Sequence, residues 1–375
     1  MCMKKFIAVD FYDLIWKQKT VFSLEDMEAL FAKYAENGIN AVLWRLSVYG
    51  KLLYHSKTPD RYAIGGAPQG VEAKALKVME TYDPAAAAVA MGKKYGIEVY
   101  FWLTLFDEAS YSVFPERESC ISQAHPEYSW RSKDGSGYYR GVLSYVYPEV
   151  IEFKLRQIRE IASYGGAGIY LCNRTHSRSP LIRKAMAEAG LDQENVNTWC
   201  REHTDLIISE YRRCRGQYGY DPIALESFKG DLNDTVAWQR HRGSYFTAFM
   251  EKARIAAQPG KLLFGLRYGA ELGPYIYGDH FFDWERFSDG TVVDALAYDI
   301  QPPNYDSPEK FPEFYRETAS SKLLWMSLSA NDPEGLLNAY APSLERWKPF
   351  MDGIILFEAY QMTGNPEYWE FIRNF

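Results

Sequence analysis

Short apolar runs alternate with helical patterns along most of this chain, and each run ends in polar or aromatic residues. The clearest runs lie at residues 6–10 (FIAVD), 41–45 (AVLWR), 99–104 (VYFWLT), 167–173 (AGIYLCN), 262–268 (LLFGLRY), 293–299 (VDALAYD), 322–327 (KLLWMS) and 353–358 (GIILFE). Apolar runs of this length, separated by helical segments, are typical of parallel strands joined by helices. Eight of them predict a (β/α)₈ TIM barrel, in which functional residues lie at the C-terminal ends of the strands.

The first helix is marked by its cap and by its apolar stripe. Ser23 is placed to cap it, and Asp26 occupies the capping-box position. Apolar side chains then recur at i, i+3, i+4 and i+7, namely Met27, Leu30, Phe31 and Tyr34. This spacing predicts a helix that packs on a sheet directly before the second strand.

The organisation of the chain predicts one domain spanning residues 1–375, with long βα loops and an insertion after strand four, at about 174–237. Two helices are expected in this insertion, near 181–190 and 197–217. The segment 220–228 (YDPIALESF) reads as a strand or as an ordered loop, and we assign it to the insertion. Long loops on the C-terminal side of a barrel suit a substrate cleft.

Composition excludes several classes of function. The net charge is −7 with no basic run, which argues against nucleic-acid binding. No apolar stretch is long enough to span a membrane, and the first apolar run is too short for a signal peptide, so a cytoplasmic protein is expected. The five cysteines form no CxxC or Cys/His cluster, so neither a disulfide framework nor a metal site is indicated. Phosphate-binding and nucleophile-elbow motifs are absent from the sequence, and no cofactor is expected.

Aromatic residues are abundant, at 16% of the chain with 29 Tyr and 10 Trp. This composition suits a carbohydrate cleft, where sugar rings stack on aromatic faces, but it also suits a tyrosine-rich core and surface. Trp44, Trp102 and Trp325 lie within predicted strands. Because side chains alternate along a strand, some of the three are expected in the core and others at the cleft.

Carboxylates end several of the predicted strands. Glu358 follows the last apolar run and is the strongest candidate, with Tyr360 close behind it. Asp299 ends strand six and Asp10 ends strand one. Gln301 and Tyr305 follow Asp299 and offer hydrogen bonds of the kind that sugar hydroxyls need. Each carboxylate could instead belong to a structural ion pair. Asp107 and Glu108 follow strand three, and as neighbours they should point to opposite faces.

Arg45, Arg174 and Arg267 also lie at strand ends. A buried arginine is costly without a partner, so each should face a carboxylate or an anionic ligand. Salt bridges in the barrel mouth are one interpretation, and bidentate recognition of a charged sugar is the other. Asn173 and Tyr268 flank Arg174 and Arg267 and complete the candidate substrate-binding residues.

In residues 147–174 (YPEVIEFKLRQIREIASYGGAGIYLCNR), a helix beginning with Pro-Glu-Val leads into the fourth strand. This segment resembles the corresponding part of the family 10-like glycoside hydrolases. Shorter matches follow at 211–222, 238–254, 264–267, 293–305 and 353–357. The resemblance covers most of the chain from about residue 148 onward. It implies a barrel that acts on glycans.

One departure from this resemblance concerns the fourth strand. The acidic residue of the family falls on Cys172, while the arginine that follows it corresponds to Arg174. A thiol, with its high pKa, does not replace a carboxylic acid as a proton donor at neutral pH. Either another carboxylate has taken this role, with Glu226 of the insertion in reserve, or the protein binds glycans without cleaving them.

The sequence therefore predicts hydrolysis of a glycosidic bond by two carboxylates, with Glu358 and Asp299 as the pair. The expected partner is an oligosaccharide or glycoside, neutral or anionic; the sequence does not indicate the oligomeric state. A non-catalytic glycan-binding barrel is the first alternative. A lyase or isomerase acting on an acidic sugar is the second.

Overall fold

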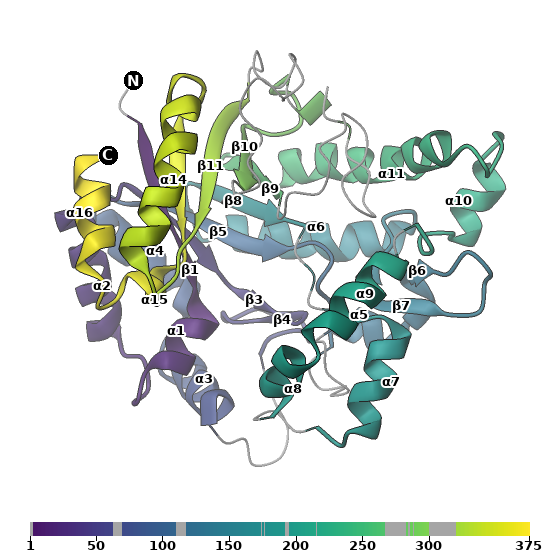
Figure 1. Ribbon diagram of the computed structural model, residues 1–375, viewed down its shortest axis with the longest axis horizontal. Coiled ribbons are helices and arrows are strands. Elements are labelled where there is room, and N and C mark those ends of the chain that lie inside the picture. The colour runs from purple at the N-terminus through teal and green to yellow at the C-terminus, as the bar shows by residue number, and fades with distance from the viewer. Residues whose placement is uncertain are drawn as a thin grey trace.

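A closed barrel of parallel strands forms the centre of the molecule (Figure 1). The computed structural model describes residues 3–62, 70–109, 118–173, 175, 177–191, 195–214, 216–266, 283, 286–287, 289–299 and 320–375. Within these ranges the barrel strands are β1 (Lys4–Asp10), β2 (Ala41–Arg45), β5 (Glu98–Thr104), β8 (Gly168–Cys172), β9 (Lys261–Leu266), β10 (Ala295–Asp299), β11 (Ser321–Ser327) and β12 (Gly353–Phe357). The first strand closes on the last, with Ile7 opposite Leu356. The predicted (β/α)₈ TIM barrel is confirmed.

Helices cover the outside of the barrel (Figure 1). They include α2 (Leu24–Glu36), α4 (Pro84–Tyr95), α6 (Pro148–Ala162), α11 (Thr235–Ala256), α14 (Pro333–Trp347) and α16 (Pro366–Asn374). The capping box expected for the first of them is present, because Ser23 accepts from the Asp26 amide and the Asp26 side chain accepts from the Ser23 amide. Among the described residues, no helix combines the length and the apolar character that a membrane crossing requires.

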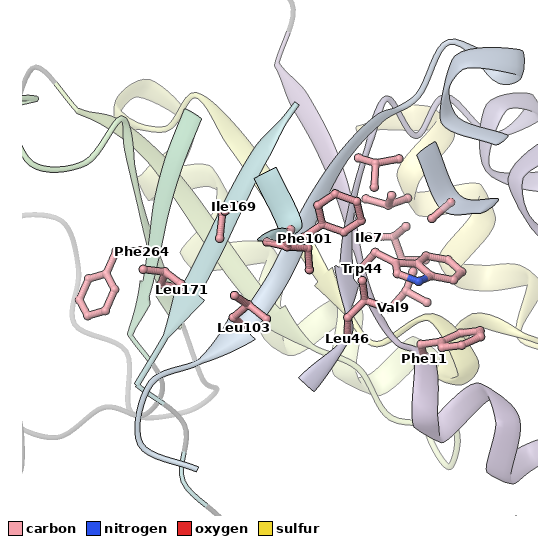
Figure 2. Packing of buried hydrophobic residues seen from close by; sticks show 14 of the residues in the cluster. Ile7, Val9, Phe11, Trp44, Leu46, Phe101, Leu103, Ile169, Leu171 and Phe264 are labelled. Carbon is pink, nitrogen blue, oxygen red and sulfur yellow. The ribbon is translucent and has the colours of Figure 1, made fainter. Parts of the chain in front are cut away.

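The hydrophobic core has an outer and an inner layer, because side chains alternate along each strand. The outer layer lies between strands and helices, and Figure 2 shows Ile7, Val9, Trp44 and Phe101 in it. The inner layer fills the barrel with residues from every strand, among them Phe6, Leu43, Tyr100, Trp102, Tyr170, Cys172, Leu263, Ala297, Trp325 and Ile355. Of the three strand tryptophans, Trp44 therefore faces the helices, whereas Trp102 and Trp325 lie inside the barrel.

Long βα connections carry secondary structure of their own. The one after β2 contains the hairpin of β3 (Ser47–Val48) and β4 (Lys51–Leu52), followed by α3 (Gly70–Thr81). The one after β5 contains α5 (Cys120–Ala124) and the hairpin of β6 (Ser129–Arg131) and β7 (Tyr138–Leu143). Both start at C-terminal strand ends and so extend the face where a barrel carries its functional residues.

The insertion after β8 is helical in its described part. It contains α7 (Pro180–Glu188), α8 (Val196–Glu202), α9 (Thr204–Cys214) and α10 (Pro222–Ser227). The segment expected as one helix at 197–217 is divided at His203 into α8 and α9. The segment at 220–228 is neither strand nor loop, because Pro222 starts a short helix that buries Ala224.

Glu210 links two of these helices. Its carboxylate accepts from the Ser179 hydroxyl at 2.7 Å and from Arg213 Nε at 2.6 Å, and Ser179 is the N-cap of α7. The hydrogen bonds from Arg213, opposed by burial and supported by Ser179 and Cys214, lower the pKa of Glu210 to about 2. The unfolded chain therefore binds a proton that the folded chain excludes between about pH 4.5 and about pH 2.

Glu210→Gln is expected to remove about 1–3 kcal/mol of unfolding free energy near neutral pH. The depressed pKa stabilises the fold above about pH 4.5, and this stability is lost as the pH falls toward about 2. Urea denaturation should show a gap between wild type and variant that narrows in acid. Glu188→Gln, at an exposed carboxylate on α7, is the control and should leave the pH profile unchanged. Parallel profiles for Glu210→Gln and wild type would contradict the assignment.

Candidate active site

Carboxylates from the first and last strands meet at the C-terminal mouth of the barrel. Asp10 ends β1, Glu358 directly follows β12, and Asp13 lies on α1 (Phe11–Lys17). One oxygen from each of the three lies within 4.8 Å of the others. The closure of β1 on β12, with Ala8 opposite Phe357, brings together groups that are far apart in sequence. Glu358 and Asp10 are 6% and 3% exposed, so both carboxylates lie in a largely desolvated site.

Arg45 neutralises part of this charge. The register of β1 and β2 sets Arg45 opposite Asp10, and the two side chains form a buried ion pair. The other guanidinium nitrogen lies 3.6 Å from Asp107 Oδ2, and the group lies 5.3 Å from the centre of the Trp102 ring. Burial alone would lower the pKa of Arg45, but Asp10 and Asp107 outweigh it and raise that pKa above its ordinary value. Arg45 is thus a permanent cation that belongs to a salt bridge.

Asp107 and Glu108 point to opposite sides, as expected for neighbours. Asp107 faces Arg45, while Glu108 forms a buried ion pair with Lys154 of α6. Burial raises the pKa of Glu108, and Lys154 opposes that shift. Only Asp107 of the two contributes to the mouth.

Trp102 forms the floor beneath Arg45. Its ring is only 1% exposed and lies against Tyr170, Trp325 and Phe357, with centroid distances of 5.8, 5.8 and 6.1 Å. Its indole nitrogen donates to Cys172 Sγ at 3.0 Å. Trp102 is therefore core beneath the site and offers no open stacking face, contrary to its interpretation as a substrate-binding residue.

Tyr360 lies on α15 (Ala359–Met362), half-buried beside Glu358. Burial, together with the negative charges of Glu358, Asp13 and Asp10, raises the pKa of Tyr360 to about 12. The phenol therefore stays protonated and donates a hydrogen bond to the Glu358 carboxylate, while Gln361 Nε2 donates to the phenol oxygen at 2.5 Å. A protonated phenol therefore lies beside the Glu358 carboxylate.

Asp299 ends β10, which is separated from β12 by β11. The register sets Asp299 opposite Trp325 and Trp325 opposite Ile355, so Asp299 is level with Ile355, three residues before Glu358. With strands roughly 4.8 Å apart and a rise of roughly 3.3 Å per residue, the backbones at Asp299 and Glu358 are separated by roughly 14 Å. Asn173 directly follows β8, and its backbone N–H donates to the backbone carbonyl of Gly265 at 3.3 Å. The side chain of Asp299 and the predicted site residues Arg174, Arg267, Tyr268, Gln301 and Tyr305 lie outside the described residues.

Glu226 is not part of this site. It is exposed on α10, whose Ser227 hydroxyl lies 3.0 Å from His241 Nε2 and 2.8 Å from the Tyr245 hydroxyl of α11. Figure 1 shows α10 on the opposite side of the molecule from α15, which follows Glu358. The structure does not bring Glu226 to the barrel mouth, because the short helix is held against the outer helix α11.

Asp13 was not among the predicted site residues, because α1 was not predicted as a helix. The sequence FYDLIWK could have indicated this helix. Its apolar residues Phe11, Leu14 and Ile15 share a buried face and leave Asp13 on the opposite, polar face. The oxygens of Asp10, Asp13 and Glu358 are spaced as ligands of a hard cation would be. Arg45 already supplies positive charge at Asp10, and we assign no cation to the cluster.

No protein-family model matches this sequence, and no curated protein matches it. Many solved structures resemble it, and two of them illustrate the shared architecture. One is the catalytic domain of β-amylase from Paenibacillus polymyxa, with a TM-score of 0.55, 12% identity, and coverage of 99% of this chain and 98% of that one. The other is α-L-fucosidase isoenzyme 2 from Paenibacillus thiaminolyticus, with a TM-score of 0.51, 14% identity and 99% of this chain covered; this chain spans 48% of its length. At such identities the shared property is the barrel fold.

Proposed function

We propose that this protein hydrolyses a glycosidic bond at the C-terminal face of its barrel, with Glu358 as the central catalytic carboxylate. The observation that carries the proposal is the buried Glu358 directly after β12, which lies close to Asp10 and Asp13 with the protonated Tyr360 phenol beside it. Catalytic groups of barrel enzymes occupy such strand ends. We also infer that the chain belongs with the family 10-like glycoside hydrolases that its sequence resembles.

Glycoside hydrolysis needs two carboxyl groups that flank the scissile bond. We propose Asp299 as the partner of Glu358, because both follow apolar strands at the C-terminal face and only β11 lies between those strands. Asp10 has a different role. Its carboxylate forms a buried ion pair with Arg45, and one of its oxygens lies within 4.8 Å of one from Glu358. The anomeric configuration of the product would distinguish a retaining pair, about 5–5.5 Å apart, from an inverting pair, about 6.5–9.5 Å apart.

The substrate that the described site supports best is a neutral glycoside or oligosaccharide. Arg45 is already held by two carboxylates and is not available to a sugar acid. Recognition of an anionic glycan would depend on Arg174 and Arg267.

A glycan-binding barrel without hydrolase activity is the second candidate. The observation that favours it is Cys172, which stands where the resembling family has its strand-four acid. Its thiol is buried at the mouth end of the barrel interior, because Cys172 is opposite Thr104, two residues beyond Trp102, and it accepts from the Trp102 indole at 3.0 Å. A thiol, with its high pKa, does not replace a carboxylic acid as the proton donor to a glycosidic oxygen.

The test is an assay of the purified protein on p-nitrophenyl glycosides and on oligosaccharides of several backbones, with release of nitrophenol or reducing ends as the readout. Activity that requires Glu358 supports hydrolysis. If calorimetry detects binding of the same compounds and none of them is cleaved, the hydrolase proposal is rejected and the glycan-binding alternative is supported.

Cys172→Ser is expected to keep most of the activity. The serine hydroxyl can still accept from the Trp102 indole, and the buried thiol takes no part in the proposed chemistry. Rate constants for wild type and variant on one substrate measure this directly. A loss of about a hundredfold or more with the fold intact would make the thiol a participant and would overturn the assignment.

A further inference from the structure

The outer face of α1 extends the candidate site toward solvent. Asp13, Trp16 and Lys17 are spaced i, i+3 and i+4, so they share one face of the helix. The other face is buried in the core through Phe11, Tyr12, Leu14 and Ile15. At one end of the exposed face Asp13 reaches the carboxylates of Asp10 and Glu358. One turn further on, Trp16 is 48% exposed.

Contacts connect Trp16 to Glu358 without a break. The Lys17 ammonium lies 4.5 Å from the centre of the Trp16 ring and 4.9 Å from the centre of the Tyr360 ring. The Tyr360 phenol in turn donates to Glu358. The two rings are therefore separated by a single ammonium group, and α1 contacts α15 along this line.

The end of α1 is also anchored. Lys74 of α3 donates to the backbone carbonyls of Trp16, at 3.3 Å, and of Gln18. An exposed aromatic ring on an anchored backbone loses little conformational freedom when a ligand binds. Single exposed apolar residues are common on protein surfaces. The argument for Trp16 therefore rests on its continuity with Asp13, Lys17 and Tyr360.

We propose that Trp16 is a stacking subsite for a sugar unit remote from the one at Glu358, with Lys17 donating hydrogen bonds beside it. The substrate is then an oligosaccharide or polysaccharide rather than the glycoside of a single sugar. An indole offers a broad apolar face to the C–H face of a pyranose, and an ammonium offers donors to its hydroxyls. This inference rests on the proposed function, because it places the subsite relative to Glu358.

The test compares Trp16→Ala and Trp16→Phe in a Glu358→Gln background, which prevents consumption of the ligand. The probes are cello-, xylo-, manno-, chito- and malto-oligosaccharides of two to six units, with affinity measured by calorimetry. For the series that binds, affinity should rise with chain length. Trp16→Ala should weaken the longest member about tenfold and the disaccharide less than about twofold, and Trp16→Phe should recover most of the loss.

Phe350→Ala is the matched control. Phe350 is an aromatic residue with 38% exposure in the 3₁₀ turn Lys348–Phe350, which leads into the N-terminal end of β12, opposite the candidate site. Its replacement should leave binding of every chain length unchanged.

Equal losses at all chain lengths, no loss, or no binding of any probe by the parent would overturn the subsite. Failure of the proposed function has a different signature. If binding depends on chain length and on Trp16, but the protein with the native Glu358 cleaves none of the probes, the subsite is supported and the proposed hydrolase activity is rejected. If the protein cleaves the probes and cleavage does not depend on Trp16 at any chain length, the hydrolase activity is supported and the subsite is rejected.

Discussion

Glu358→Gln is expected to lower the rate of glycoside hydrolysis by at least about a hundredfold while leaving folding and glycan binding intact. Glutamine keeps the shape of the side chain and can still accept from the Tyr360 phenol, but it carries neither the charge nor the exchangeable proton of the carboxyl group. General acid–base catalysis alone contributes about 10²–10⁴-fold, and the loss of a nucleophile costs more.

The effect should fall on kcat, with the dissociation constant for oligosaccharides and the thermal midpoint nearly unchanged. Asp13→Asn is the comparison variant, because Asp13 belongs to the same carboxylate group but lies on a helix rather than at a strand end. We expect it to cost less than about tenfold. Near-full activity of Glu358→Gln would show that Glu358 is not catalytic. Unfolding would show that it holds the barrel mouth together, and the binding-protein alternative would gain.

The strands could be predicted from sequence because barrel strands are buried on both faces and read as continuous apolar runs. Their bounds differ from the observed ones by a few residues, as at Gly353–Phe357 against the predicted 353–358. Helices α1 and α3 were missed, since the first directly continues β1 and the second lies within a segment that contains several turns. A short apolar pattern does not distinguish such helices from loops.

The sequence indicated several residues of the candidate site but not the contacts between them. Strand ends identified Asp10, Arg45 and Glu358, but only closure of the barrel places β12 beside β1. The need of Arg45 for a carboxylate followed from its residue type, whereas the choice of Asp10 follows from the register of β1 and β2. Neither residue type nor strand register predicted that Trp102 is buried. Alternation along the strand shows which face of the barrel wall a side chain is on, but not which residues cover it.

Glu226 shows the limit of reasoning from loop position. Its place in an insertion on the C-terminal side of the barrel made it a candidate for the mouth. The buried Ala224 and the contacts of Ser227 hold α10 against α11, so Glu226 does not reach the mouth. These contacts depend on packing between segments that the local sequence does not encode.

Arg45→Met is expected to give the largest loss of stability, about 3–5 kcal/mol of unfolding free energy. Methionine fills a similar volume over Trp102, but it leaves the buried carboxylates of Asp10 and Asp107 without their cation. Uncompensated charge in a desolvated site is far more costly than the loss of an exposed ion pair. Urea denaturation near neutral pH measures the difference.

The control is Arg254→Met, which removes an ion pair to Asp294 at 2.8 Å in which both side chains are about a quarter exposed. It should cost about 1 kcal/mol or less. Adding Asp10→Asn to Arg45→Met should recover part of the lost stability, because the amide removes one of the two orphaned charges. Mild acid should act in the same direction on the single variant, since protonation of a buried carboxylate relieves the same cost. A loss no larger than that of Arg254→Met, or no recovery in the double variant, would mean that Arg45 does not hold the mouth by charge, and that its packing on Trp102 is its main contribution.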